Sequence, residues 1–153
     1  MKLSHFHTYQ EIFQQPELWL DVFELIYSKR NEVEEFTKEI FDDVSADIIF
    51  TGAGSSFFIG EMVAGHYQQK LSNTCRAVSS TELVTNTLQY INKNRRQLVV
   101  SFARSGNSPE SIAAVDFVSA ANPLTKHILI SCNGSGALAQ RKWSPNELLM
   151  VLP

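Results

Sequence analysis

Short, unbroken apolar runs recur along this 153-residue chain, and they constrain its fold more than any other feature. Segments with helical spacing of apolar residues separate the runs, and strands that alternate with helices are typical of a parallel sheet covered on both faces. The sequence therefore predicts an α/β domain with a three-layer, doubly wound sheet of five parallel strands, of the flavodoxin-like kind. The five predicted strands contain residues 48–50, 77–78, 98–100, 128–130 and 148–152.

A helical extension over residues 1–45 is expected to precede this domain, which takes residues 46–153. Apolar side chains recur at helical spacing over residues 19–40, and charged side chains occupy the opposite face. Pro16 suits the first position of a helix. The pattern predicts either a helical hairpin or one long helix, with a break near Asn31.

The chain ends at Pro153, directly after the fifth apolar run. In a doubly wound domain, ligands bind beyond the carboxyl ends of the strands, so further chain is expected after the last strand. We therefore expect this chain to be a truncated fragment of a longer protein.

Charge and hydropathy exclude several classes of function. Thirteen basic and sixteen acidic residues give a formal net charge of −3, without a basic block, so nucleic acid is a poor partner. No apolar run reaches the roughly 18 residues that cross a bilayer, and the N-terminus lacks a signal core, so we expect a cytoplasmic protein without a membrane partner.

Cys75 and Cys132 stand in no metal or redox spacing, so they are expected to be reduced and mostly buried, and no metal site is predicted.

Three residues receive structural interpretations. His66 lies among apolar residues of a predicted helix, so we expect a packed core histidine. His127 precedes the fourth apolar run and is expected at the surface. Thr81 follows the second run at a position where it could cap a helix.

A first polar loop, Gly52-Ala53-Gly54-Ser55-Ser56, lies between a predicted strand and a predicted helix. Glycines let the backbone approach a ligand closely, and a helix N-terminus with free N–H groups attracts an anion. These features suit a phosphate monoester, although such turns are common. The loop is not the dinucleotide fingerprint, because Phe58 stands where the third glycine would fall, and no Gly-Lys-Ser/Thr of a P-loop follows.

A second polar loop, residues 103–108, follows the third run. It reads Ala-Arg-Ser-Gly-Asn-Ser, and a helix is expected to start with Ser108 as the cap, Pro109 at the first position and Glu110 in the first turn. Taken alone, the loop could be a capped turn with a surface arginine. Because both loops follow strands of one parallel sheet, however, we expect them to line one cavity at the carboxyl edge and to converge on one anion.

Both loops resemble those of a known family. The segment SFARSGNSPES at residues 101–111 resembles the serine-rich phosphate loop of SIS (sugar isomerase) domains, and residues 52–56 resemble the first sugar-binding loop of those domains. The resemblance runs from about residue 45 to the end of the chain. It is closest to the tagatose-6-phosphate ketose/aldose isomerase branch, which includes galactosamine-6-phosphate deaminases, and it implies the first SIS domain of a two-domain protein.

The resemblance also implies which residues bind the ligand. Hydroxyl groups and backbone N–H groups of the two loops would hold the phosphate and face the sugar. Ala103 departs from the family pattern, since many SIS domains have a serine there, and charge-assisted bonds from Arg104 could compensate. Glu82 matches a carboxylate near the family's ligand or dimer contact, although an ordinary acid in a first helical turn is the alternative. The substrate-binding candidates are Gly54, Ser55, Ser56, Glu82, Arg104, Ser105, Gly106, Asn107 and Ser108.

For the full-length protein, the resemblance implies an enzyme of amino-sugar and carbohydrate metabolism. It would isomerise a hexose or hexosamine 6-phosphate, with or without deamination, as a homodimer or higher homo-oligomer and without a cofactor. The base that moves the proton and the acid that opens the ring match no motif here, so the catalytic residues are unknown and the fragment alone is expected to be inactive. Two alternatives are a sugar-phosphate-sensing SIS module without catalysis and a dimerisation module without a ligand.

Overall fold

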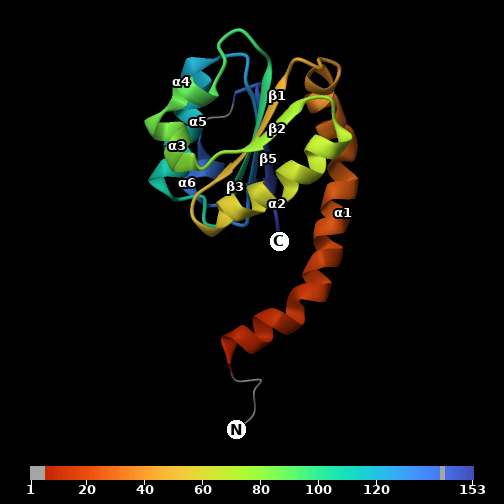
Figure 1. The fold of residues 1–153 in the computed structure, drawn as a ribbon. Coiled ribbons are helices and arrows are strands. Elements are labelled where there is room, and N and C mark those ends of the chain that lie inside the picture. The colour runs from red at the N-terminus through yellow and green to blue at the C-terminus, as the bar shows by residue number, and fades with distance from the viewer. Residues whose placement is uncertain (1–5, 142–143) are drawn as a thin grey trace.

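A computed structural model describes residues 6–141 and 144–153 of the chain (Figure 1). Five parallel strands form one sheet in the order β2-β1-β3-β4-β5, which confirms the predicted doubly wound α/β architecture. Strands β1, β3 and β4 contain the predicted apolar runs, β5 contains its run except for Leu152, and β2 overlaps its run by one residue. The strands are β1 (Asp47–Gly52), β2 (Thr74–Ala77), β3 (Gln97–Ala103), β4 (Lys126–Ser131) and β5 (Glu147–Val151).

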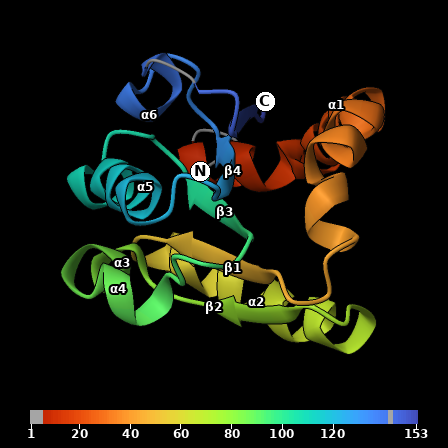
Figure 2. The ribbon, with the colours of Figure 1, turned by 90° about the horizontal axis from the view of Figure 1, so that it is seen from above.

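Helices cover both faces of the sheet, so the molecule has three layers (Figure 2). Two helices, α1 (His7–Phe41) and α2 (Ser55–Lys70), lie on one face. The other face carries α3 (Ser80–Thr85), α4 (Thr87–Tyr90), α5 (Pro109–Ala121) and α6 (Ala137–Gln140). Successive side chains of a strand point to opposite faces and pack in different cores. Ile48 packs on the α1 and α2 side, while Ile49 packs on the α3 and α5 side.

The N-terminal extension is one continuous helix, which decides between the two predicted arrangements. No break occurs near Asn31, and Pro16 lies inside α1 rather than at its first position, so both of these expectations were wrong. A proline inside a helix removes one backbone hydrogen bond, and α1 bends within its N-terminal third, which contains Pro16 (Figure 1). Its C-terminal part packs on the core, but Trp19 and Phe23, further toward the N-terminus, are 66% and 67% exposed.

Several predictions for single residues were wrong because they depended on where elements begin and which side faces inward. His127 is buried, since β4 already starts at Lys126 and pairs on both edges. His66 is exposed, because α2 turns Gly60 and Ala64 toward the sheet.

The helix cap and one cysteine also differ from expectation. Helix α3 begins one residue before Thr81, and Ser79 caps it by accepting a hydrogen bond from the Glu82 N–H at 3.2 Å. Cys75 and Cys132 are both free thiols; Cys75 is buried as expected, whereas Cys132 is exposed after β4. Within the described ranges, no helix combines the length and apolar character needed to span a bilayer, and no three His, Cys, Asp or Glu side chains gather as metal ligands.

Candidate functional site

The two polar loops leave the sheet side by side. Strands β1 and β3 pair in parallel, and Gly52 at the end of β1 lies opposite Phe102 near the end of β3. The loop over residues 53–56, called the first loop below, and the loop over residues 103–108, called the second loop, therefore start at the same carboxyl edge, as predicted. Both present exposed residues to solvent, so this edge is open in the described chain.

The first loop turns the chain directly into helix α2. Gly54 has φ +55° and occupies the N-cap position, so it offers no side chain to cap the helix. The backbone N–H groups of Ser56 and Phe57 donate to the Ala53 and Gly54 carbonyls. The hydroxyls of Ser55 and Ser56 make no hydrogen bond to any other described residue, so both can serve a ligand at the helix N-terminus.

The second loop is held by hydrogen bonds among its own residues. Ser105 Oγ accepts from the Asn107 N–H at 3.3 Å, so this N–H group is engaged within the loop. Ser108 stands at the N-cap of α5 with Pro109 next, as predicted, but its hydroxyl does not cap the helix. It donates instead to Ser111 Oγ at 2.6 Å.

Gly106 gives the second loop its sharp turn. Its φ is +66°, a backbone conformation that side-chain-bearing residues rarely adopt. A Cβ atom at this position would also lie 3.2 Å from Ser131 Oγ. The loop therefore needs a glycine here both for its conformation and for its close approach to the end of β4.

A third loop, residues 132–136, supports the second loop, and the sequence reasoning did not assign it a role. Asn133 Nδ2 donates to the Ser105 carbonyl at 3.0 Å, and the Asn107 side-chain oxygen accepts from the Ala137 N–H at 2.8 Å. The Leu138 N–H donates to the Gly106 carbonyl at 2.8 Å. The signal available in the sequence was the polar, glycine-containing stretch after the fourth apolar run, which must reach the same sheet edge.

Arg104 is the cation of the second loop. It is exposed, and it makes no ion pair or hydrogen bond with another described residue. Arginine presents donors that match the oxygens of a phosphate, so a free guanidinium beside two serines suits an anionic ligand.

Glu82 follows β2 and therefore also lies toward the carboxyl edge, yet its contacts are structural. Its carboxylate accepts hydrogen bonds from the Ser79 hydroxyl, the Ser79 N–H and the Tyr90 hydroxyl. These bonds, the Ser79 side chain first, lower the pKa of Glu82. In the described chain Glu82 forms a capping box with Ser79. This agrees with the alternative interpretation, that Glu82 is an ordinary acid in the first turn of a helix.

Two buried hydroxyls beneath the loops were missed from sequence. Thr51 and Ser101 are register partners on β1 and β3, each near the carboxyl end of its strand. Both side-chain oxygens are buried without a hydrogen-bond partner among the described residues. A buried hydroxyl without a partner costs about 1–3 kcal/mol, so these two are polar groups that the site edge leaves unsatisfied. The signal was a hydroxyl residue at the end of each apolar run.

Comparison with known proteins identifies the family of the chain. The model of the SIS domain family matches residues 43–145. D-galactosamine-6-phosphate deaminase AgaS from Escherichia coli is 37% identical over 147 residues, which cover 95% of this chain and 38% of the relative. The protein of that name from Shewanella sp. (strain ANA-3) is 39% identical over 137 residues, covering 88% and 35%.

Solved structures give the same result. The crystal structure of tagatose-6-phosphate ketose/aldose isomerase from Escherichia coli superposes with a TM-score of 0.91 at 36% identity, covering 98% of this chain and 41% of that one. The chain thus spans little more than a third of the length of the curated relatives it matches. The matched family model, the relatives and the paired polar loops agree, and the chain belongs to the SIS domain family.

Proposed function

We propose that this chain is the phosphosugar-binding domain of a ketose/aldose isomerase or deaminase that acts on a hexose or hexosamine 6-phosphate. The observation that carries the proposal is the placement of two serine- and glycine-containing loops side by side at one sheet edge, each leading into a helix N-terminus. The names of the relatives, a galactosamine-6-phosphate deaminase and a tagatose-6-phosphate isomerase, support this substrate class.

The phosphate would be held mainly by the second loop. Ser105 and Ser108 would donate hydroxyl hydrogen bonds, and Arg104 would add a charge-assisted bond from the rim. The hydrogen bond between the Asn107 N–H and Ser105 Oγ is long, at 3.3 Å. A phosphate oxygen could take its place and form a shorter hydrogen bond with each of the two groups. The free hydroxyls of the first loop would then face the sugar or a remaining phosphate oxygen.

The proton transfers would depend on groups outside the two loops. Aldose–ketose isomerisation moves a proton between adjacent carbons, so it needs a positioned base and, for a cyclic sugar, an acid that opens the ring. Asp116 is engaged with Arg141 at 2.6 Å, and Glu82 caps α3, so neither has a free carboxylate aimed at the loops. We infer that this chain supplies the phosphate clamp, and that the base comes from another part of the full-length protein or from a partner subunit. The proposed reaction uses no metal or organic cofactor.

We further propose that the protein works in the cytoplasm as a homodimer. The exposed apolar side chains of α1, among them Trp19 and Phe23, would lose unfavourable contact with water in such an assembly. A dimer would also let one subunit complete the open edge of the other.

Calorimetric titration of the chain with tagatose 6-phosphate and galactosamine 6-phosphate tests the proposal. Both should bind, whereas tagatose and galactosamine without phosphate should bind at least about tenfold more weakly, because they lose the charge-assisted hydrogen bonds. Equal affinity with and without phosphate would contradict the proposed clamp. Binding by a full-length protein that never turns over either ligand would instead support the sensing alternative.

A further inference from the structure

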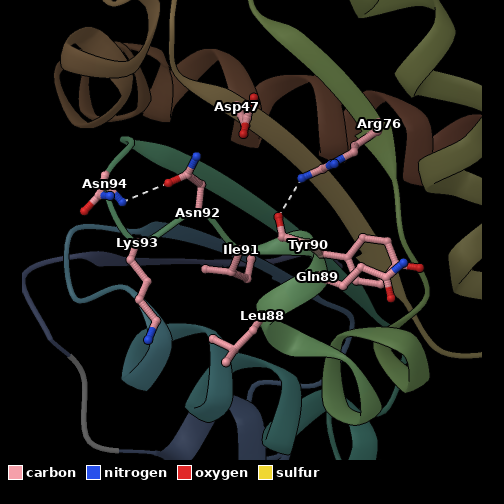
Figure 3. A pocket seen from close by; sticks show the side chains of 9 residues that line it. All are labelled: Asp47, Arg76, Leu88, Gln89, Tyr90, Ile91, Asn92, Lys93 and Asn94. Carbon is pink, nitrogen blue, oxygen red and sulfur yellow. Dashed lines mark hydrogen bonds between the residues drawn. The ribbon is translucent and has the colours of Figure 1, made fainter.

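A second polar concavity lies at the opposite, amino edge of the sheet (Figure 3). Its volume is about 520 Å³, and it lies between the start of β1, strand β2 and the segment that contains most of the four-residue helix α4. Asp47 and Arg76 come from the two strands, and the segment 88–94 forms the rest of the lining. This concavity, called the amino-edge pocket below, shares no residue with the two polar loops.

Asp47 is the first unusual feature of the amino-edge pocket. It is only 7% exposed, and its carboxylate makes no hydrogen bond or ion pair with any described residue. Its backbone N–H is used, since it donates to the Arg96 carbonyl at 3.1 Å. Its carboxylate oxygens have no partner in the described chain yet are not fully buried, so they face the open pocket and can accept a hydrogen bond or ion pair there.

Arg76 brings the opposite charge to the same pocket without neutralising Asp47. Its Nη2 donates to the Tyr90 carbonyl, and its guanidinium lies 5.9 Å from the centroid of the Tyr90 ring. No nitrogen of Arg76 lies within 4.0 Å of the Asp47 carboxylate, since no ion pair joins them among the described residues. A guanidinium has five N–H donors, so most of its capacity remains.

The two side chains start from nearby positions on the sheet. Arg76 is the register partner of Ile49, two residues along β1 from Asp47, so the two side chains start from a diagonal pair of positions on one sheet face. Neighbouring strands lie about 4.8 Å apart and two residues of a parallel strand rise about 6.6 Å, so such diagonal positions lie about 8 Å apart. Lys93 does not fill the gap, because its side chain extends away from Asp47 (Figure 3).

We propose that the amino-edge pocket binds a compact zwitterion of the α-amino acid type, whose ammonium group bonds Asp47 and whose carboxylate bonds Arg76. An ammonium ion alone would leave Arg76 unmatched, and a carboxylate alone would meet Asp47 with like charge. The side-chain amides of Gln89 and Asn94 at the rim offer hydrogen bonds to a polar ligand side chain. The pocket is independent of the phosphate clamp, so its ligand is not the sugar phosphate.

Three small probes of similar size separate the contributions of the two charges. L-alanine carries both groups, L-lactate lacks the ammonium, and isopropylamine lacks the carboxylate. In ¹H–¹⁵N NMR titrations of the whole 153-residue chain, L-alanine should give saturable shifts at Asp47, Arg76 and residues 88–94. Each of the other two probes should bind at least about tenfold more weakly, because one charge-assisted interaction is lost.

Two variants and a control then test the named residues. Asp47→Asn and Arg76→Gln should each weaken L-alanine binding by about tenfold or more. Asp21→Asn removes the same charge from an exposed position on α1 and should leave binding unchanged. Retained NMR dispersion shows that the variants fold, and their tagatose 6-phosphate affinity should equal that of the unchanged chain.

Several outcomes would overturn the proposal. One is that L-alanine shifts these residues no more than L-lactate does, and another is that it binds Asp47→Asn as tightly as the unchanged chain. Loss of sugar-phosphate binding with retained L-alanine binding would refute only the proposed function, so the two hypotheses fail separately.

Discussion

Ser105 and Ser108 differ in their present contacts, and these contacts set what each substitution should do. Ser105→Ala and Ser108→Ala should each weaken sugar-phosphate affinity about tenfold or more, because a hydrogen bond to a charged group is lost. Losing an N-cap hydroxyl usually costs about 1 kcal/mol of stability. The Ser108 hydroxyl bonds the buried Ser111 hydroxyl rather than capping α5, so the cost of Ser108→Ala should instead be that of a buried hydroxyl left without a partner, about 1–3 kcal/mol.

Calorimetry measures the affinities of these variants, and urea denaturation measures their free energies of unfolding. Ser135→Ala is a suitable control, since its hydroxyl bonds Asn133 Oδ1 at 2.8 Å in the third loop rather than facing the proposed phosphate. Unchanged affinity in both Ser105→Ala and Ser108→Ala would remove these serines from the phosphate site.

Gly106 should be difficult to replace. Gly106→Ala places a Cβ atom at φ +66° and close to Ser131 Oγ, so it should lower the free energy of unfolding by about 1–2 kcal/mol. Gly65→Ala is the matched control, because Gly65 lies in helix α2 with open space around it and should gain about 0.5–1 kcal/mol. Equal effects of the two substitutions in urea denaturation would contradict this account of the second loop.

His127 should make stability depend on pH. Burial, followed by the charge of Arg141, lowers the pKa of His127 to about 4, while Ser119 bonds its Nε2 at 3.1 Å. The unfolded chain, with a histidine pKa near 6.5, therefore binds more protons than the folded chain between those two values. Stability is fully present above pH 6.5 and falls as the pH drops toward 4, by about 2 kcal/mol between pH 7 and pH 5.

The contribution of His127 can be isolated with variants. In His127→Gln the difference in unfolding free energy between pH 7 and pH 5 should shrink by most of that amount, whatever the variant's stability at pH 7. His66→Gln removes an exposed histidine and should keep the full difference. The same pH dependence in all three proteins would show that another group causes it.

At the scale of elements, the sequence predicted β1, β3, β4 and β5 well because each contains a continuous apolar run, whereas β2 reads Thr-Cys-Arg-Ala and was predicted less well. Side-chain environments were harder, as His127 and His66 show, because they depend on strand starts and on which face of a helix turns inward. The third loop escaped notice for a related reason. Its Asn133 acts through a contact with Ser105, 28 residues away, and no local pattern reveals such a contact.

Helix α1 carries a prediction of its own. Its apolar side chains at Trp19, Phe23 and Ile26 are exposed, and burying such side chains stabilises an assembly. If α1 takes part in the proposed homodimer, Phe23→Asp should shift the chain from dimer toward monomer in sedimentation equilibrium. Glu24→Asp, at the adjacent helix position, should not do so, and a chain that is monomeric without any substitution would contradict the proposal.

At the scale of the whole molecule, the sheet separates two polar regions. The two loops lie at its carboxyl edge and the amino-edge pocket lies at the other, with β1 running from Asp47 to Gly52 between them. The first region was predictable, because ligands of doubly wound sheets bind at the carboxyl ends of strands. The second was not, because it depends on how the segment 88–94 packs beside the start of β1 and Arg76 of β2.

The chain by itself should bind a sugar phosphate and yet fail to isomerise or deaminate it. The two loops offer hydroxyls, N–H groups and Arg104, which bind an anion but do not accept a proton from carbon. Without a positioned base, proton transfer loses a factor of about 10²–10⁴ in rate. A coupled assay with galactosamine 6-phosphate and tagatose 6-phosphate measures this, with the full-length Escherichia coli deaminase as the active comparison.

If the chain turned over either substrate at a comparable rate, its base would have to be one of its own carboxylates. Glu61 and Glu82 would then be the first to replace with glutamine, since both follow strands that end at the carboxyl edge.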